Sequence, residues 1–213
     1  MKPFRTHKGV VAHLDRENVD TDQIIPKQFL KRIERTGYGP FLFFDWRRIQ
    51  EGPNAGEPHP DFILNHPDYQ DAEILVAGKN FGCGSSREHA AWALADYGFR
   101  CVLAPAFADI FFSNAGKNGI LLAVLPQEQI DILLERAKQP GYKLNVSLET
   151  EEVTDSQGFH AKFRTDPFRR DCLLNGLDDI GLSLRHASAI DQFEAQHNRE
   201  SWFSPRPSAG ASA

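Results

Sequence analysis

The sequence predicts an α/β fold in a single domain with a mixed sheet. Between residues 73 and 138, short apolar segments typical of buried strands alternate with segments whose apolar residues recur at helical spacing. Farther along, residues 143–148 and 160–164 alternate apolar and polar side chains around a turn at 155–158, which is typical of antiparallel pairing. The first pattern favours parallel neighbours and the second favours antiparallel ones, so we expect both in one sheet.

The first third of the chain is predicted to be poor in regular structure. Residues 10–14 are a short strand candidate, a turn-rich segment follows to residue 26, and residues 28–33 are weakly helical. The long loop at 36–69 is rich in glycine and proline, which exclude long helices or strands. Its many aromatic residues argue against a simple linker. We expect the loop to be partly disordered in the isolated chain, because these aromatic side chains need a partner's surface to be buried.

The remaining elements follow in order. We predict strands at 73–77, 101–104 and 120–125, and helices at 86–97, 108–115 and 127–138. After the antiparallel strands, helices are predicted at 167–175 and 184–197. The small, polar segment 204–213 is predicted to be a disordered tail, so the predicted domain covers residues 1–203.

Charge and composition exclude several classes of protein. The formal net charge is −5 and the basic residues are scattered, so we expect no nucleic-acid partner. No signal-peptide core and no apolar segment of about 18 residues is present, so we expect no membrane contact and a cytoplasmic location. The three cysteines (Cys83, Cys101 and Cys172) form no CxxC pair, which favours neither disulfides nor a complete metal or iron–sulfur site.

The segment 80–90 (NFGCGSSREHA) carries the most chemical information, because it lies between a predicted strand and a predicted helix. Gly84, like Gly82, permits a tight turn and the close approach of a ligand. Ser85 and Glu88 have the spacing of a capping box at the start of the helix. The next amides would then point out of an electropositive helix end, and Arg87 adds a planar fork that suits a carboxylate. The segment is therefore predicted to bind a small carboxylate anion.

On these residues alone a purely structural interpretation stays open, in which Ser85 only caps a helix and Arg87 only pairs with a surface acid. Three other sites are disfavoured. A Walker phosphate loop requires a Gly-Lys-Ser/Thr sequence, a serine-hydrolase elbow requires GxSxG, and a dinucleotide loop requires glycine where Arg87 stands.

The same segment resembles the GSSREHA stretch of the swivelling domain of the aconitase superfamily, and residues 18–26 (NVDTDQIIP) look like the opening motif of its small subunits. Residues 28–47, 107–119 and 168–182 resemble the bacterial isopropylmalate dehydratase small-subunit family in particular. The motifs agree in order and spacing from residue 8 to residue 193. The resemblance implies a swivelling β/β/α domain with a mixed, partly closed sheet.

The resemblance also implies a hydro-lyase of leucine biosynthesis. Enzymes of this family interconvert 2-isopropylmalate and 3-isopropylmalate by removing and re-adding water through 2-isopropylmaleate. By the same resemblance, Ser85 is the base that takes the carbon-bound proton, Ser86 contacts the substrate, Arg87 grips a carboxylate, and Gly84 belongs to the substrate-binding loop.

Family resemblance assigns a [4Fe–4S] cluster, one iron of which acts as a Lewis acid, to a separate large subunit. This chain is expected to bind no metal by itself. It is expected to act on a 2-hydroxy diacid, and only when it is assembled with the large subunit as a heterodimer or heterotetramer.

A specificity segment is implied near Leu30 and Lys31, where an apolar side chain suits an isopropyl group and an arginine would suit a third carboxylate. Asp20, Thr21 and Asp22 either line the cleft or form Asx turns that fix the loop. Two other functions stay open. The chain is either the small subunit of a related hydro-lyase for a methylmalate- or homoaconitate-type acid, or a non-catalytic dicarboxylate-binding module.

Overall fold

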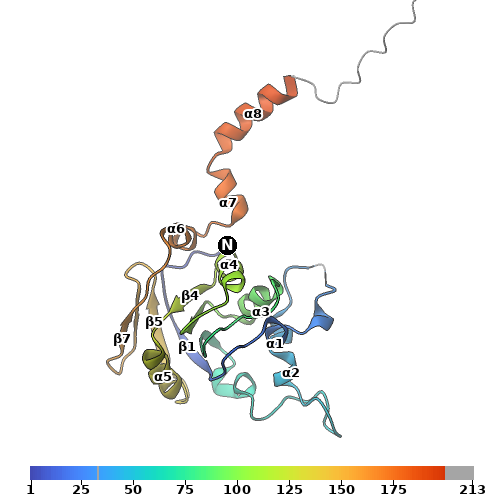
Figure 1. Cartoon of the computed structure of the whole chain (residues 1–213), viewed down its shortest axis with the longest axis vertical. Coiled ribbons are helices and arrows are strands. Elements are labelled where there is room, and N and C mark those ends of the chain that lie inside the picture. Colours follow the sequence, from blue (N-terminus) through green and yellow to red (C-terminus); the bar gives the residue numbers. More distant parts are fainter. Residues whose placement is uncertain (33, 200–213) are drawn as a thin grey trace, which may run out of the picture. The chain divides into compact units, whose positions relative to one another are not determined.

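The computed structural model describes residues 1–32 and 34–199, and its main feature is one mixed sheet of seven strands (Figure 1). The strands run in the order β4-β3-β2-β1-β5-β6-β7. The pairs from β4 to β1 are parallel and the pairs from β1 to β7 are antiparallel. The predicted mixed α/β sheet is thus confirmed. Its strands are β1 Thr6–Leu14, β2 Ala72–Ala77, β3 Cys101–Ala104, β4 Leu121–Val124, β5 Lys143–Ser147, β6 Glu152–Thr154 and β7 His160–Lys162.

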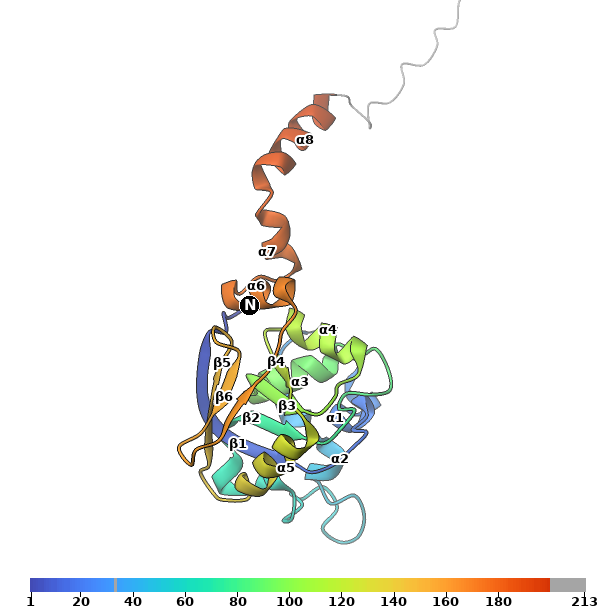
Figure 2. The same ribbon diagram turned by 60° about the vertical axis from the view of Figure 1, so that its left-hand side comes forward.

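The sheet is partly closed, as predicted. Val124 on one edge strand lines the same cavity of about 450 Å³ as Lys162 on the other edge strand. Figure 2 shows β5 and β6 lying beside β1, where the sheet curves. This curvature brings the two edges toward each other, which is the half-barrel shape expected for a swivelling domain of this class.

Helices cover both faces of the sheet in the body that spans Met1–Asp178. One face packs against Ile24 of α1, Leu94 of α3 and Phe111 of α4, and the other packs against Leu133 of α5 and Leu173 of α6. Figure 1 shows α5 and α3 on opposite sides of the strands. Because both faces are covered, β2 and β3 are apolar along nearly their whole length. These helices are α1 Thr21–Ile24, α2 Phe44–Arg47, α3 His89–Tyr97, α4 Asp109–Lys117, α5 Gln127–Arg136 and α6 Pro167–Asn175.

Most predicted elements are confirmed, two of them (101–104 and 167–175) with the predicted bounds. β1 begins earlier than predicted, because its first residues pair antiparallel with β5. The predicted pairing of 143–148 with 160–164 is corrected, since β6 lies between them and pairs with both. The predicted helix 184–197 corresponds to α8 Ala187–Arg199, which begins three residues later because the amides of Arg185 and His186 bond three residues back in a tight turn. The sequence did not predict the preceding helix α7 Asp179–Leu184.

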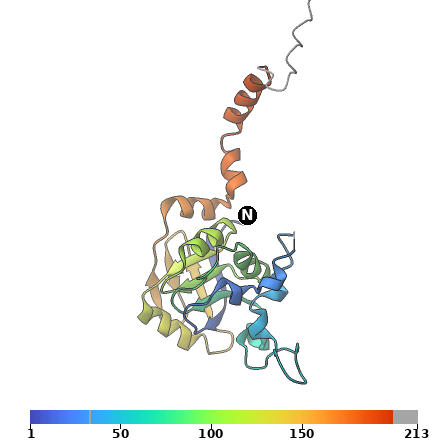
Figure 3. The ribbon, with the colours of Figure 1, turned by 45° about the vertical axis from the view of Figure 1, so that its right-hand side comes forward.

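The region from residue 36 to residue 69 contains only short elements, as its glycines and prolines predict, with a projecting loop between α2 and residue 63 (Figure 3). Tyr38 and Phe43 are fully buried, and Phe62 and Tyr69 are nearly so. The chain's own core therefore buries these aromatic side chains, and they do not need a partner's surface for burial. Besides α2, its elements are the 3-10 helices Gly39–Phe41, Ile63–Asn65 and Pro67–Tyr69.

A separate compact unit begins at Asp179, and its described part consists of α7 and α8. Ile180, Leu184 and Phe193 expose most of their surface there. Among the helices of the described ranges, none is long and apolar enough to cross a membrane. The extent of one domain to residue 203 stays a prediction, and both Ile33 of the predicted weak helix and the predicted tail 204–213 lie outside the described residues.

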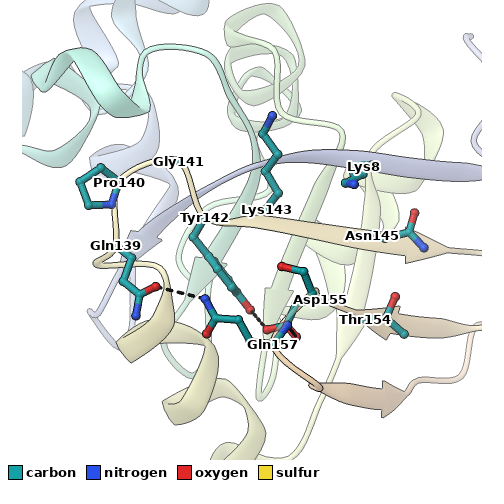
Figure 4. Close-up of a pocket in the computed structure, with 11 residues that line it drawn as sticks. Lys8, Gln139, Pro140, Gly141, Tyr142, Lys143, Asn145, Thr154, Asp155 and Gln157 are labelled. Atoms are coloured by element: carbon teal, nitrogen blue, oxygen red, sulfur yellow. Dashed lines mark hydrogen bonds between the residues drawn. The ribbon is translucent and has the colours of Figure 1, made fainter.

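A buried carboxylate organises the turn between β6 and β7 (Figure 4). The Asp155 side chain has 0% exposure and accepts a hydrogen bond from the Tyr142 hydroxyl at 2.6 Å. It also accepts one from the Phe159 amide at 2.8 Å. Arg136 of α5 pairs with it at 2.5 Å. Burial alone raises the pKa of Asp155, but the hydrogen bonds from Tyr142, the Phe159 amide and Arg136 together lower it further than burial raises it. The network joins the turn to α5.

We expect Asp155→Ala to reduce the free energy of unfolding by about 3 kcal/mol, because buried donors lose their acceptor. Urea denaturation measures the change, and Asp131→Ala, which removes an exposed partner of Gln127, is the control. Folding lowers the pKa of Asp155, so the ionised carboxylate stabilises the folded protein. This stabilisation is fully present above the pKa of the unfolded chain, about 3.9, and is lost as the pH falls through the pKa of the folded protein. The difference in the free energy of unfolding between the wild-type protein and Asp155→Ala should persist from neutral pH to about pH 4 and should shrink at lower pH. Equal stability of the two variants at neutral pH would contradict the prediction.

Candidate functional site

Two loops that follow neighbouring parallel strands lie side by side at one end of the sheet. The first loop follows β1 and the second follows β2. The amide of Asn18 donates to the carbonyl of Lys79 at 2.8 Å, and the amide of Gly82 donates to the carbonyl of Val19 at 2.8 Å. The motifs singled out in the sequence therefore meet at the carboxyl ends of the strands, where sites of α/β proteins form.

Gly84 allows the second loop to pass close to the first. Its φ angle is +90°, and a Cβ atom there would collide with the carboxylate of Asp20. Asp20 caps α1, because its carboxylate accepts the amide of Asp22 at 2.6 Å while its own amide donates to the side chain of Gln23 at 2.9 Å. Of the two roles predicted for Asp20, the turn that fixes the loop is therefore observed.

Ser85 and Ser86 are exposed, and the backbone of Ser85 is held from two sides. The buried hydroxyl of Thr21 donates to the carbonyl of Ser85 at 3.1 Å, and the amide of Thr21 donates to the carbonyl of Cys83 at 2.9 Å. The amide of Arg87 donates to the same Ser85 carbonyl at 2.8 Å and closes a three-residue turn. The loop thus presents Ser85 to solvent on a fixed backbone.

The predicted helix cap at Ser85 is wrong. α3 begins at His89, and Glu88 occupies the cap position without a side-chain hydrogen bond to the helix. The turn between Ser85 and Arg87 takes the chain off the helical path, and the Glu88 carboxylate accepts the side-chain amide of Asn118 at 2.9 Å instead. The positive charge near Ser85 therefore comes from Arg87 and not from the predicted helix-end amides.

Arg87 belongs to a charged cluster drawn from three segments. Its guanidinium pairs with one carboxylate oxygen of Asp22 in α1, and the other oxygen of Asp22 lies 3.2 Å from the ammonium of Lys27. The Arg87 side chain is 18% exposed and that of Asp22 is 35% exposed. A guanidinium has five donors along two edges, so one ion pair does not exhaust its capacity. Arg87 therefore keeps donors that can bind a small carboxylate besides Asp22.

The predicted specificity segment follows directly on Lys27. Lys27–Phe29 form a 3-10 helix, and the amide of Leu30 donates to the carbonyl of Lys27 at 3.1 Å. Leu30 is half-buried and packs against the core, while Lys31 is exposed. The ion pair of Lys27 with Asp22 links this turn to the Arg87 cluster, and a substrate pocket at Leu30 stays a prediction.

The residues present do not fit an iron–sulfur cluster. Within residues 1–32 and 34–199, no group of three or more His, Cys, Asp or Glu side chains is placed to hold a metal ion. Cys83 beside the site is half-buried, and Cys101 and Cys172 are buried in β3 and α6. Partial burial and the Asp20 carboxylate raise the pKa of Cys83, which disfavours the thiolate that a metal would need.

Sequence reasoning missed two parts of this site, the Thr21 bond to Ser85 and the pairing of Asp22 with Arg87. A signal for the first loop was present, because Asp20 and Gln23 have the spacing of a capping box and predict a short helix at Thr21. The contacts between the loops carry no local signal, since they depend on the parallel pairing of β1 with β2.

Comparisons with known proteins place this chain among named relatives. A family model described as the aconitase C-terminal domain matches residues 1–128. Two further models, described as LeuD_N and as the C-terminal domain of the 3-isopropylmalate dehydratase small subunit, match residues 131–167 and 179–203. The 3-isopropylmalate dehydratase small subunit of Acidobacterium capsulatum is 61% identical over 100% of this chain and 98% of its own. The corresponding protein of Halalkalibacterium halodurans is 59% identical over 92% of this chain and 98% of its own. The crystal structure of 3-isopropylmalate dehydratase (leuD) from Methanocaldococcus jannaschii matches with a TM-score of 0.65 and 25% identity, covering 88% of this chain and 99% of that one.

Proposed function

Because this chain belongs to the family of 3-isopropylmalate dehydratase small subunits, we propose that it is the small subunit of a hydro-lyase in leucine biosynthesis. Together with a large subunit it interconverts 2-isopropylmalate and 3-isopropylmalate by removing and re-adding water through 2-isopropylmaleate. The observation that carries the proposal is that the exposed residues Ser85 and Ser86 share one turn with Arg87, on a loop that the chain itself holds in place.

Arg87 grips one carboxylate of the substrate. The planar guanidinium matches a carboxylate with two parallel hydrogen bonds, and its low exposure strengthens those bonds relative to water. Ser86 adds a hydroxyl donor beside it, and Gly84 leaves room for the ligand because it has no side chain. Binding of the acid therefore fixes the carbon next to the carboxylate above the loop.

Ser85 acts as the base. Its deprotonated oxygen forms a bond to the hydrogen on that carbon, the C–H electron pair becomes the double bond, and the neighbouring hydroxyl leaves with its electron pair. Negative charge develops on the carboxylate as the proton departs. Arg87 stabilises this charge, because its guanidinium holds the carboxylate on which the charge develops.

The large subunit supplies what this chain lacks. Since the described residues of this chain do not fit a cluster, we assign the [4Fe–4S] cluster and the remaining acid–base groups to that subunit. When it is bound there, the cluster supplies Lewis acidity to the leaving hydroxyl. We propose that the two subunits form a heterodimer or heterotetramer in the cytoplasm, with the 2-hydroxy diacid bound between them.

Reconstitution tests the proposal. The purified chain is mixed with a cluster-loaded large subunit, and the absorbance of the unsaturated intermediate is followed with isopropylmalate, a methylmalate or homocitrate as substrate. We expect turnover of isopropylmalate by the mixture and by neither subunit alone. Preference for another acid would favour a related hydro-lyase, and dicarboxylate binding without any turnover would favour a non-catalytic module.

Leu30→Arg should lower kcat/KM for isopropylmalate by about 10- to 100-fold, because a charged side chain is a poor neighbour for an isopropyl group. Steady-state kinetics of the reconstituted complex measure the change. Gln28→Arg is the matched control, since it adds the same charge to an exposed position of the same turn. Unchanged kinetics in Leu30→Arg would refute the placement of the isopropyl group at this residue.

A further inference from the structure

We propose that Asp22 is a positioning residue that aims the guanidinium of Arg87, an inference that rests on the proposed function. Asp22 contacts Arg87 directly, and it comes from the loop after β1 whereas Arg87 comes from the loop after β2. Through Arg87, Asp22 acts on the substrate without touching it.

Asp22 can aim another side chain because its own place is fixed. The capping box of Asp20 and Gln23 holds the backbone of α1, and the amide of Asp22 itself bonds to the Asp20 carboxylate at 2.6 Å. On either side of Asp22, Thr21 and Ile24 are buried with exposures of 1% and 0%. The carboxylate is therefore carried by a turn that is anchored in the core.

The same turn holds both partners of the proposed reaction. Thr21 binds the carbonyl of Ser85, and its neighbour Asp22 binds the side chain of Arg87. Two consecutive residues of α1 thus fix the position of the base relative to the carboxylate-binding cation. Because a displacement of about 1 Å between such groups lowers a rate by about 100-fold, we expect the loss of either contact to slow catalysis.

The negative charge of Asp22 affects the orientation of the Arg87 guanidinium and the attraction of an anion in opposite ways. Asp22 partly neutralises Arg87, and Lys27 pairs with the second oxygen of Asp22 at 3.2 Å. Removing the negative charge of Asp22 makes the site more positive, so an anion is held at least as well as before, but the guanidinium loses its direction. A positioning role therefore predicts a loss in kcat without a loss in binding.

Asp22→Asn is the main test, because asparagine keeps the size of the side chain and the cap at Asp20 is untouched. In the reconstituted complex we expect kcat to fall by about 10- to 100-fold. We expect the KM for isopropylmalate and the Kd of malonate, a simple dicarboxylate probe, to stay unchanged or to decrease. Asp22→Glu should recover part of the activity, since it restores the charge.

Two further variants support the test. Asp45→Asn is the matched control, because Asp45 occupies the first turn of the four-residue helix α2 as Asp22 does in α1, and it should leave kcat unchanged. Lys27→Met removes the exposed ammonium that pairs with Asp22, and it should also lower kcat, by no more than about fivefold. It keeps the proposal testable if Asp22→Asn fails to assemble.

The outcomes separate this inference from the proposed function. Full kcat in Asp22→Asn together with an inactive Ser85→Ala would overturn the positioning role alone. A parallel loss of kcat, malonate binding and thermal stability in Asp22→Asn would also overturn it, because such a residue only supports the fold. Full turnover by Ser85→Ala would instead overturn the proposed function.

Discussion

Replacing Ser85 with alanine is expected to lower kcat of the reconstituted dehydratase by about 10²- to 10⁴-fold, the range that positioned proton transfer contributes. The KM for isopropylmalate should change little, because Arg87 still grips the carboxylate. The substitution removes only the hydroxyl, since Thr21 and Arg87 hold the Ser85 backbone through its carbonyl. The absorbance of the unsaturated intermediate measures the rate.

Two controls make this result specific to the Ser85 hydroxyl. Ser156→Ala removes a hydroxyl from the exposed turn after β6 and should leave turnover unchanged. Ser86→Ala should have a smaller effect than Ser85→Ala, because it loses one neutral hydrogen bond to the substrate and no proton transfer. Gel filtration shows that each variant still binds the large subunit. Full activity of Ser85→Ala would require another base.

The parallel half of the fold could be predicted because each strand is covered on both faces. Cys101–Ala104 is a continuous apolar segment with a helix on either side in sequence, and its bounds are those predicted. β6 could not be predicted, because Glu152–Thr154 has a single apolar residue, Val153, and only its pairing with β5 and β7 identifies it as a strand. A segment of three residues is too short to show the alternation of apolar and polar side chains by which a strand is predicted.

The candidate site could be predicted in composition but not in conformation. Gly84 and Arg87 indicated a tight turn that receives a carboxylate, and the structure confirms the turn. The capping box at Ser85 failed because its rule considers only local hydrogen bonds. Bonds from Thr21 to Ser85 and from Asn118 to Glu88 compete with it across distances of 64 and 30 residues in sequence. Such contacts follow from the packing of the sheet and are not visible in the motif.

Arg87→Gln should lower kcat/KM by about 10³-fold, because the substrate carboxylate loses a charged partner in a largely buried position. Unlike Ser85→Ala, this variant should raise KM strongly. It should also raise the inhibition constant of malonate, because malonate binds more weakly. Arg5→Gln, which removes an exposed arginine paired with Glu149, is the matched control and should leave all constants unchanged.

Arg87→Lys distinguishes a directed fork from a simple positive charge. Lysine keeps the charge but cannot make two parallel hydrogen bonds to a carboxylate, and it cannot bind Asp22 and the substrate along separate edges. We expect about 100-fold lower kcat/KM, with most of the loss in kcat, because the cation attracts the acid without orienting it. Combining Arg87→Lys with Asp22→Asn should then cost little more than Arg87→Lys alone, since Asp22 has no guanidinium left to aim. Additive losses would mean that Asp22 and Arg87 serve the reaction independently, and wild-type kinetics in Arg87→Lys would reduce the role of Arg87 to electrostatic attraction.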